Sequence, residues 1–234
     1  MRQSKPIKPR NIDPLAVELM TGLEAHPNAR HFVLGGYFAL KHYCDYRPTH
    51  DVDAWWDSQA GELQRQEARH SLEQVMQAMA RRHGLELNTR RFGDTESREL
   101  VRAGDKIFSF QISARTVQLE PYLDSPWPPL QIESLADNVG SKMNALVQRG
   151  APRDFVDVRQ LAEAGLVGPA ECWELWQRKN PDLTVDAARA EVARHVHELE
   201  LRRPLNAITD PAERVRAAAT RLWFKEHFLS LPSQ

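Results

Sequence analysis

One stretch near the N-terminus constrains the fold of this 234-residue protein more than any other. Its apolar residues 31–34 predict a buried strand, and the Gly35-Gly36 pair that follows permits a tight turn with close backbone approach. Residues 37–43 predict a helix of about two turns. A second strand is predicted over residues 51–56. Strand, glycine turn, helix and strand in this order indicate an α/β unit.

Two carboxylates stand at the start of the second strand. Residues two apart in a strand point to the same face, so Asp51 and Asp53 are expected to lie side by side. Like charges this close repel unless a cation lies between them, and oxygen ligands suit Mg²⁺, with Mn²⁺ as a substitute. The alternative is a solvated strand end. Trp55 and Trp56 argue against it because they direct the strand into a core.

A second pattern lies about 90 residues further along the sequence. On a helix predicted from Glu133 to Arg149, Lys142 interrupts an otherwise apolar stripe with steps of three and four residues. The stripe consists of Leu135, Val139, Lys142, Leu146 and Arg149. A lysine there either extends its ammonium to the surface or points it into a cleft. Asp154 and Asp157 open the next helix, where acids also favour the helix dipole.

Together the two patterns resemble the polymerase-β-type nucleotidyltransferases, and among these the AbiEii/AbiGii-like toxin family of bacterial phage-defence and toxin–antitoxin systems. The matching residues are Gly35-Gly36, Arg47-x-Thr49-x-Asp51-x-Asp53, Lys142 to Leu146, Arg149, and Arg153-Asp154-x-x-Asp157. The resemblance covers roughly residues 30–165. It implies an α/β (α+β) nucleotidyltransferase-type domain with a mixed sheet, followed by an all-α helical domain.

The resemblance also implies roles for individual residues. Asp51 and Asp53 would be catalytic and hold the metal, and Lys142 would direct its charge at the nucleotide phosphates. Asp154 would complete the active site from the helical domain, while Asp157 would orient an arginine by bidentate pairing. The implied nucleotide-binding residues are Gly35, Gly36, Arg47, Thr49, Arg149 and Arg153. For Arg47 and Thr49, turn chemistry before the strand is the alternative.

The reaction implied by the family is the transfer of a nucleotidyl group from a nucleoside triphosphate to an acceptor hydroxyl. An RNA acceptor, such as a tRNA end, and an antitoxin partner are expected, and a protein acceptor is the alternative. One residue departs from the family pattern. Where these enzymes usually carry a third carboxylate, the strand predicted over residues 107–112 has Gln111, which cannot act as a base. A non-catalytic nucleotide-binding or interaction protein on the same scaffold is therefore the second hypothesis.

The order of elements predicts two parts. Further strands are expected near residues 85–87, 100–102, 107–112 and 117–119, and a long helix over 57–83. Four prolines between residues 121 and 129 indicate a junction near residue 130. The expected domains are therefore residues 1–130, which are α/β, and residues 131–234, which are helical.

Composition limits the remaining functional classes. A net charge of −1 gives no overall basic signature for nucleic acid, so an RNA would need a local basic patch. The two cysteines and nine histidines show no metal-binding spacing. No apolar run approaches the ~20 residues of a membrane span, and no signal peptide follows the basic N-terminus. The expected location is the cytoplasm, without a membrane partner.

Overall fold

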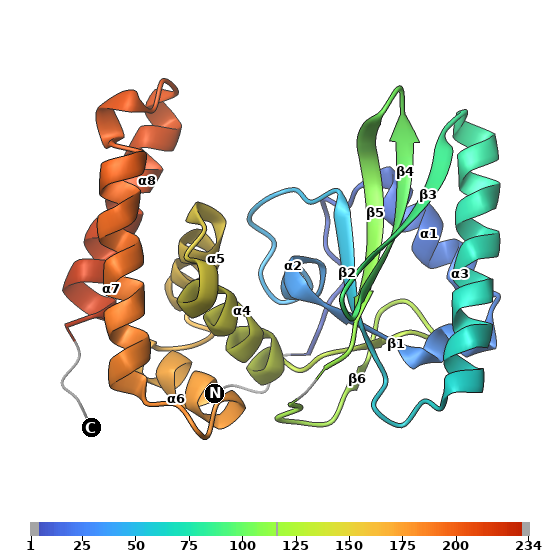
Figure 1. The fold of residues 1–234 in the computed structure, drawn as a ribbon, viewed down its shortest axis with the longest axis horizontal. Coiled ribbons are helices and arrows are strands. Elements are labelled where there is room, and N and C mark those ends of the chain that lie inside the picture. Colours follow the sequence, from blue (N-terminus) through green and yellow to red (C-terminus); the bar gives the residue numbers. More distant parts are fainter. Residues whose placement is uncertain (1–4, 116, 231–234) are drawn as a thin grey trace. The chain divides into compact units, whose positions relative to one another are not determined.

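The computed structural model describes residues 5–115 and 117–230 (Figure 1). They form two compact units, one ending at Asn138 and the other beginning at Val139. The division falls within helix α4 (Leu135–Arg149) rather than near residue 130. Residues 131–138 belong to the first unit because they supply a short strand and several buried polar side chains to it. Whether either unit is an independent domain stays a prediction.

In the described part of the protein, seven strands form one mixed sheet in the order β3-β4-β5-β2-β1-β7-β6. The strands are β1 (Phe32–Gly35), β2 (Asp51–Trp56), β3 (Glu86–Phe92), β4 (Thr95–Arg102), β5 (Asp105–Ser113), β6 (Leu123–Asp124) and β7 (Gln131–Ile132). Strand β2 lies between β1, to which it is antiparallel, and β5, to which it is parallel. The mixed α/β architecture predicted from the sequence is thus present.

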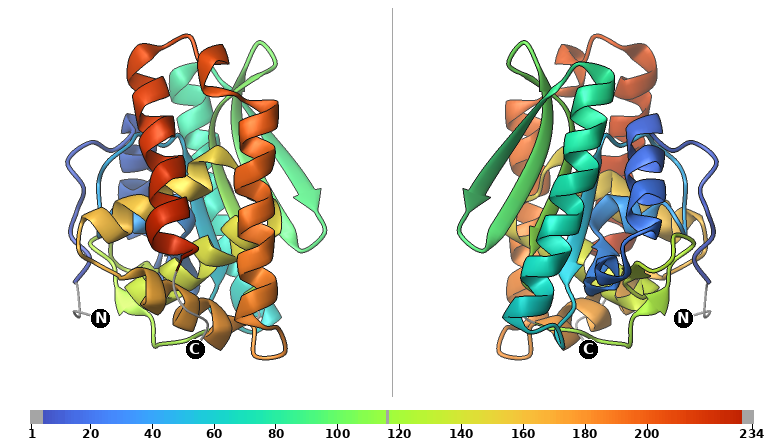
Figure 2. Two further views of the ribbon diagram at one scale, coloured as in Figure 1. Left: turned by 90° about the vertical axis from the view of Figure 1, so that its left-hand side faces the viewer. Right: turned by 90° about the vertical axis from the view of Figure 1, so that its right-hand side faces the viewer.

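Alternation along β2 decides which side chains enter the core. Val52, Ala54 and Trp56 are buried in the main apolar cluster with residues of α1 (Pro14–Glu24) and α3 (Glu62–His83). These two helices cover one face of the sheet (Figures 1 and 2). The odd-numbered residues of β2, including both aspartates, therefore lie on the opposite face.

The strands β3, β4 and β5 form two consecutive hairpins. Gly93 has φ +56° in the first turn, and Ala103 and Gly104 have φ 51° and 90° in the second. Positive φ at both central residues of the second turn, and at the first central residue of the first turn, gives turns whose twist matches that of the flanking strands. The turn predicted at Gly93-Asp94 is confirmed. The turn predicted at Gly104-Asp105 is present one residue earlier, at Ala103-Gly104, since Asp105 in β5 already pairs with Arg102.

Several predicted boundaries were wrong. Residues 117–119 are not a strand. Instead, the backbone N–H groups of Leu119 and Glu120 donate to the Asp137 carboxylate, at 3.0 Å each. Helix α3 begins at Glu62 rather than at residue 57, because the backbone N–H of Gly61 donates to Gln64 Oε1 and the helix is capped there.

The first unit also contains three short helical segments and the second unit is built from helices. The short segments are the 3₁₀ turn Pro27–His31, α2 (Gly36–Leu40) and the start of α4. The second unit contains the rest of α4, α5 (Pro152–Glu163), α6 (Pro169–Lys179), α7 (Val185–Arg202), the 3₁₀ turn Leu205–Ala207 and α8 (Pro211–Trp223).

The helix predicted over residues 211–228 is α8 extended by a π-helical turn, Phe224–Phe228. The change of helical period lets both phenylalanines of this turn enter the core of the second unit. There the Phe224 ring centroid lies 4.8 Å from those of Phe155 and Phe228. Among the described helices, none has the length and apolar character that crossing a membrane requires.

Candidate functional site

The two aspartates of β2 face a polar row on β5. Pairing of the parallel strands places Asp51 beside Ser109 and Asp53 beside Gln111. Directly paired residues point to the same side of a sheet, so all four side chains share one face. The neighbour of Asp53 on the next strand is therefore an amide rather than a carboxylate. That Gln111 replaces a catalytic acid stays a prediction.

Asp51 is held by three residues that belong to two segments. Its Oδ1 accepts hydrogen bonds from Lys106 Nζ at 2.8 Å and from Ser109 Oγ at 2.7 Å. The Thr49 hydroxyl accepts from the backbone N–H of Asp51 at 3.3 Å and donates to its carbonyl oxygen at 3.1 Å. Thr49 thus performs the turn chemistry that the sequence left open, and a contact with nucleotide stays a prediction.

Lys106 and Ser109 were missed in the sequence. The signal that could have found Ser109 is its spacing of two from Gln111, which places both on one face of the same strand. Lys106 carries no such signal, because its contact with Asp51 depends on the parallel register of β2 and β5. Its side chain is 42% exposed and that of Asp51 is 36% exposed, so both can meet a ligand from solvent.

The glycine pair lies directly against β2. Gly36 has φ +57°, and a Cβ atom there would lie 2.1 Å from Asp53 Oδ2 and 2.7 Å from Asp53 Cβ. A Cβ on Gly35 would lie 2.2 Å from Trp55 Nε1. Any larger residue would therefore displace either the turn or the strand. The glycine backbone thus closely approaches Asp53. An approach of a phosphate to this turn stays a prediction.

Arg47 lies over the helix that follows the glycines. Its guanidinium carbon is 3.4 Å from the ring centroid of Tyr37, within cation–π range. The Tyr37 hydroxyl accepts from the Arg47 N–H and donates to the Arg47 carbonyl oxygen, both at 2.9 Å, and Lys41 Nζ donates to the same oxygen at 2.8 Å. These bonds fix the loop between α2 and β2. A phosphate contact by Arg47 stays a prediction.

The remaining predicted residues lie in the helical unit. Lys142 is buried with its Nζ 2.7 Å from Asp157 Oδ2, and Asp157 is fully buried. Arg149 makes the bidentate pair with Asp154, at 2.8 and 2.9 Å. The sequence had suggested Asp157 for such a pair, and the structure shows one at Asp154. An arginine oriented by Asp157 stays a prediction.

Asp154 also acts locally. Its Oδ2 accepts from the Ala151 N–H at 3.2 Å and so caps the start of α5, while Arg153 is exposed on the same turn. Asp51 and Asp53 belong to the sheet unit, whereas Lys142, Arg149, Arg153 and Asp154 belong to the helical unit. A cleft that brings the two sets together stays a prediction.

Comparison with known proteins points to one family. The model of a family described as nucleotidyl transferase AbiEii toxin, type IV TA system, matches residues 18–226, which is most of the sequence. No curated protein matches the sequence.

Proposed function

The chain belongs to the AbiEii family, the nucleotidyltransferase toxins of type IV toxin–antitoxin systems, and on that premise we propose that it transfers a nucleotidyl group from a nucleoside triphosphate to an acceptor hydroxyl. The observation that carries the proposal is the contact between the Gly36 turn and Asp53, beside Asp51 on one strand. This contact places a glycine turn that could bind a triphosphate next to two carboxylates that could bind its metal ion. Pyrophosphate is the second product.

The donor set fits Mg²⁺. Asp51, Asp53, Ser109 and Gln111 offer only oxygen as metal ligands, and hard divalent cations prefer oxygen. Within the described residues no group of three or more His, Cys, Asp and Glu side chains gathers to hold a metal by itself. Two aspartates with a phosphate-bearing substrate are the usual way to bind Mg²⁺, so Asp51 and Asp53 are proposed as its ligands. The bound ion would supply charge neutralisation at the phosphates.

The protein's own residues have distinct proposed tasks. Lys106 neutralises Asp51 before substrate arrives and is exposed enough to turn toward a phosphate oxygen. Ser109 keeps the Asp51 carboxylate in place through its hydroxyl. Lys142 and Asp154 are proposed to complete the site from the helical unit, with Arg47, Arg149 and Arg153 as phosphate contacts. The proposed acceptor is an RNA hydroxyl such as a tRNA end, with a protein hydroxyl as the alternative.

One observation favours a second candidate function. Gln111 lies beside Asp53 on the neighbouring strand. We infer that it takes the place of the third carboxylate usual in these enzymes, and an amide cannot accept a proton from an acceptor hydroxyl. A protein that binds the triphosphate without transferring it would keep the two aspartates and the glycine turn. Metal-dependent stabilisation by triphosphate without any turnover would favour this second function.

The deciding experiment offers each α-³²P-labelled triphosphate with Mg²⁺ to total cellular RNA and to lysate protein. Label in one fraction identifies both activity and acceptor. The double variant Asp51→Asn/Asp53→Asn should abolish labelling, whereas Asp94→Asn, in the exposed β3–β4 turn, should not. Equal labelling by the wild type and the double variant would remove both aspartates from the site.

A further inference from the structure

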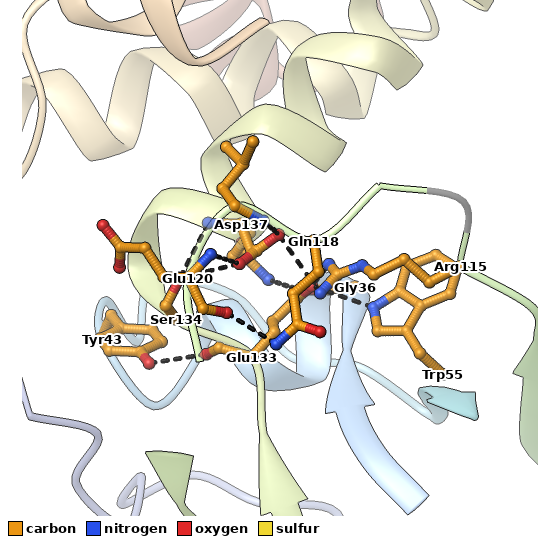
Figure 3. Close-up of polar contacts among 11 residues, drawn as sticks. Gly36, Tyr43, Trp55, Arg115, Gln118, Glu120, Glu133, Ser134 and Asp137 are labelled. Carbon is orange, nitrogen blue, oxygen red and sulfur yellow. Dashed lines mark hydrogen bonds and ion pairs between the residues drawn. The ribbon is translucent and has the colours of Figure 1, made fainter. Parts of the chain in front are cut away.

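Two fully buried carboxylates share one arginine within the sheet unit (Figure 3). Arg115 contacts Glu133 through Nη2 and lies 3.4 Å from Asp137 Oδ1 through Nη1. The Arg115 side chain is only 6% exposed. Burial of two negative charges against one positive charge is costly unless further donors solvate the carboxylates. The groups that donate hydrogen bonds to Glu133 and Asp137 therefore identify the parts of the backbone that these carboxylates hold in place.

The donors that reach Glu133 come from the neighbourhood of the glycine turn. Trp55 Nε1 donates to Glu133 Oε2 at 2.9 Å (Figure 3). Asn138 Nδ2 donates to Glu133 Oε1 at 2.5 Å. The same Trp55 nitrogen lies against Gly35, where a Cβ atom would be 2.2 Å away. The same Asn138 nitrogen also donates to the backbone carbonyl oxygen of Gly36 at 2.7 Å. One carboxylate thus reaches both glycines, each through one intermediate side chain.

The chemistry of Asn138 allows only one orientation of its amide. Gly36 O and Glu133 Oε1 are both acceptors, so the NH₂ group must face them. Among the described residues, Asn138 Oδ1 has no hydrogen-bond partner, although it is buried. The side chain therefore gives up one acceptor bond to make two donor bonds, which ties the first turn of α4 to the glycine turn.

We propose that Glu133 is a positioning residue for the candidate site: its carboxylate fixes Trp55 under Gly35 and Asn138 under Gly36, and so sets the turn against Asp53. Both oxygens of a carboxylate accept hydrogen bonds, and this is what the role requires. A glutamine would offer one acceptor and one NH₂ group. If that NH₂ takes the place of Oε2, it faces the N–H donors of Trp55 and Arg115. If it takes the place of Oε1, it faces the NH₂ group of Asn138.

A glutamine at position 133 would release the turn by a definite route. Its NH₂ can be accommodated only if the Asn138 amide flips, which brings Oδ1 to the glutamine and also to Gly36 O. Two carbonyl oxygens then oppose each other, so the Gly36 backbone moves. Its effect on nucleotide binding rests on the proposed function, whereas its effect on the turn does not.

The test uses full-length protein and a signal that belongs to Gly36 alone. Gly35-Gly36 is the single Gly-Gly pair in the sequence, so labelling glycine with ¹⁵N and ¹³C′ gives one carbonyl-coupled amide signal, that of Gly36. The variants are Glu133→Gln and Asn138→Ala, the second retaining a good helix former within α4. The control is Tyr43→Phe, which removes a 2.8 Å bond to the backbone carbonyl oxygen of Glu133 and leaves the carboxylate untouched.

We expect the Gly36 signal to move in Glu133→Gln and in Asn138→Ala but not in Tyr43→Phe. In the first two variants, calorimetric binding of each triphosphate with Mg²⁺ should weaken about tenfold, the effect of losing roughly one charge-assisted hydrogen bond. An unmoved Gly36 signal in folded Glu133→Gln overturns the proposal, as does a moved signal with wild-type affinity. If wild-type protein binds no triphosphate, the proposed function fails and the Gly36 signal alone decides the positioning role.

Discussion

Replacement of Gly36 by alanine separates the cost of backbone strain from the cost of displacing Asp53. Gly36 and Gly84 have nearly the same backbone angle, φ +57° and +61°. A Cβ on Gly84, at the end of α3, would meet nothing within 4 Å, whereas one on Gly36 would meet Asp53. Gly84→Ala is therefore a matched control that carries the strain without the contact.

The magnitudes follow from these two terms. Alanine in the left-handed region costs about 1–2 kcal/mol, and this applies to both variants. Gly36→Ala adds a contact of 2.7 Å to Asp53 Cβ, which a side-chain rotation cannot relieve because Cβ moves only with the strand. Overpacking of this kind costs typically about 1–3 kcal/mol more. Each kcal/mol lowers the melting temperature by about 2–4 °C in a protein of this size.

The assay is thermal unfolding of both variants with and without triphosphate and Mg²⁺. A ligand that binds only the folded state raises the melting temperature by mass action. We expect Gly84→Ala to keep this rise and Gly36→Ala to lose it, because the displaced Asp53 no longer lies beside Asp51. If Gly36→Ala has the same melting temperature as Gly84→Ala, and triphosphate with Mg²⁺ still raises it, then the contact between the Gly36 turn and Asp53 has no role in binding.

Three further predictions follow from the charges. Lys106→Met should raise the affinity for Mg²⁺ about 1.4- to 5-fold, because Mg²⁺ must displace an exposed Lys106–Asp51 ion pair worth about 0.2–1 kcal/mol. Calorimetric titration with Mg²⁺ measures this, and an unchanged affinity would contradict it. Lys142→Met should cost about 3–5 kcal/mol in urea unfolding, because it removes one partner of the buried ion pair with Asp157, and adding Asp157→Leu should recover most of this loss. Burial lowers the pKa of His42 from 6.5 to about 4, so between these pH values the imidazole gains a proton in the unfolded state only, and the free energy of unfolding falls as pH decreases. His42→Asn should flatten this part of the curve of unfolding free energy against pH. An unaltered slope would assign the pH dependence to another group.

Local pattern was enough to predict the parts of the fold that local chemistry determines. Val52, Ala54 and Trp56 of β2 are buried, so Asp51 and Asp53 lie on the face away from the main core. That the two aspartates share one face was predicted from their spacing of two residues. A strand has period two, so this assignment needs no knowledge of its neighbours. The hairpin turns were predictable for the same reason, since Gly93 and Gly104 supply positive φ wherever the hairpin lies.

Contacts that depend on register between distant strands were not predictable. Lys106 and Ser109 reach Asp51 only because β5 lies parallel to β2 with Ser109 beside Asp51. Lys106 and Ser109 are three residues apart, a spacing that regular alternation would place on opposite faces of a strand. The pairing of β4 with β5 shifts register between Leu100 and Val101, beside Lys106, and the sequence does not indicate this irregularity. The support of the glycine turn by Glu133 was hidden likewise, because 78 residues separate Glu133 from Trp55.

The lysine of α4 shows how a residue can stand out in the sequence while its ion-pair partner stays hidden. The apolar stripe marked Lys142 as unusual, and two explanations followed from it: an ammonium at the surface or one in a cleft. The ammonium is buried and paired with Asp157 of α5, which follows α4 after a turn at Gly150, where φ is +53°. A cleft beside this pair stays a prediction. Whether Lys142 also serves a nucleotide is separable from this pairing. Asp157→Asn keeps a hydrogen-bond acceptor for the lysine but removes the charge that holds it, so a loss of transfer with little loss of stability would place the function in the pair rather than in Lys142 alone.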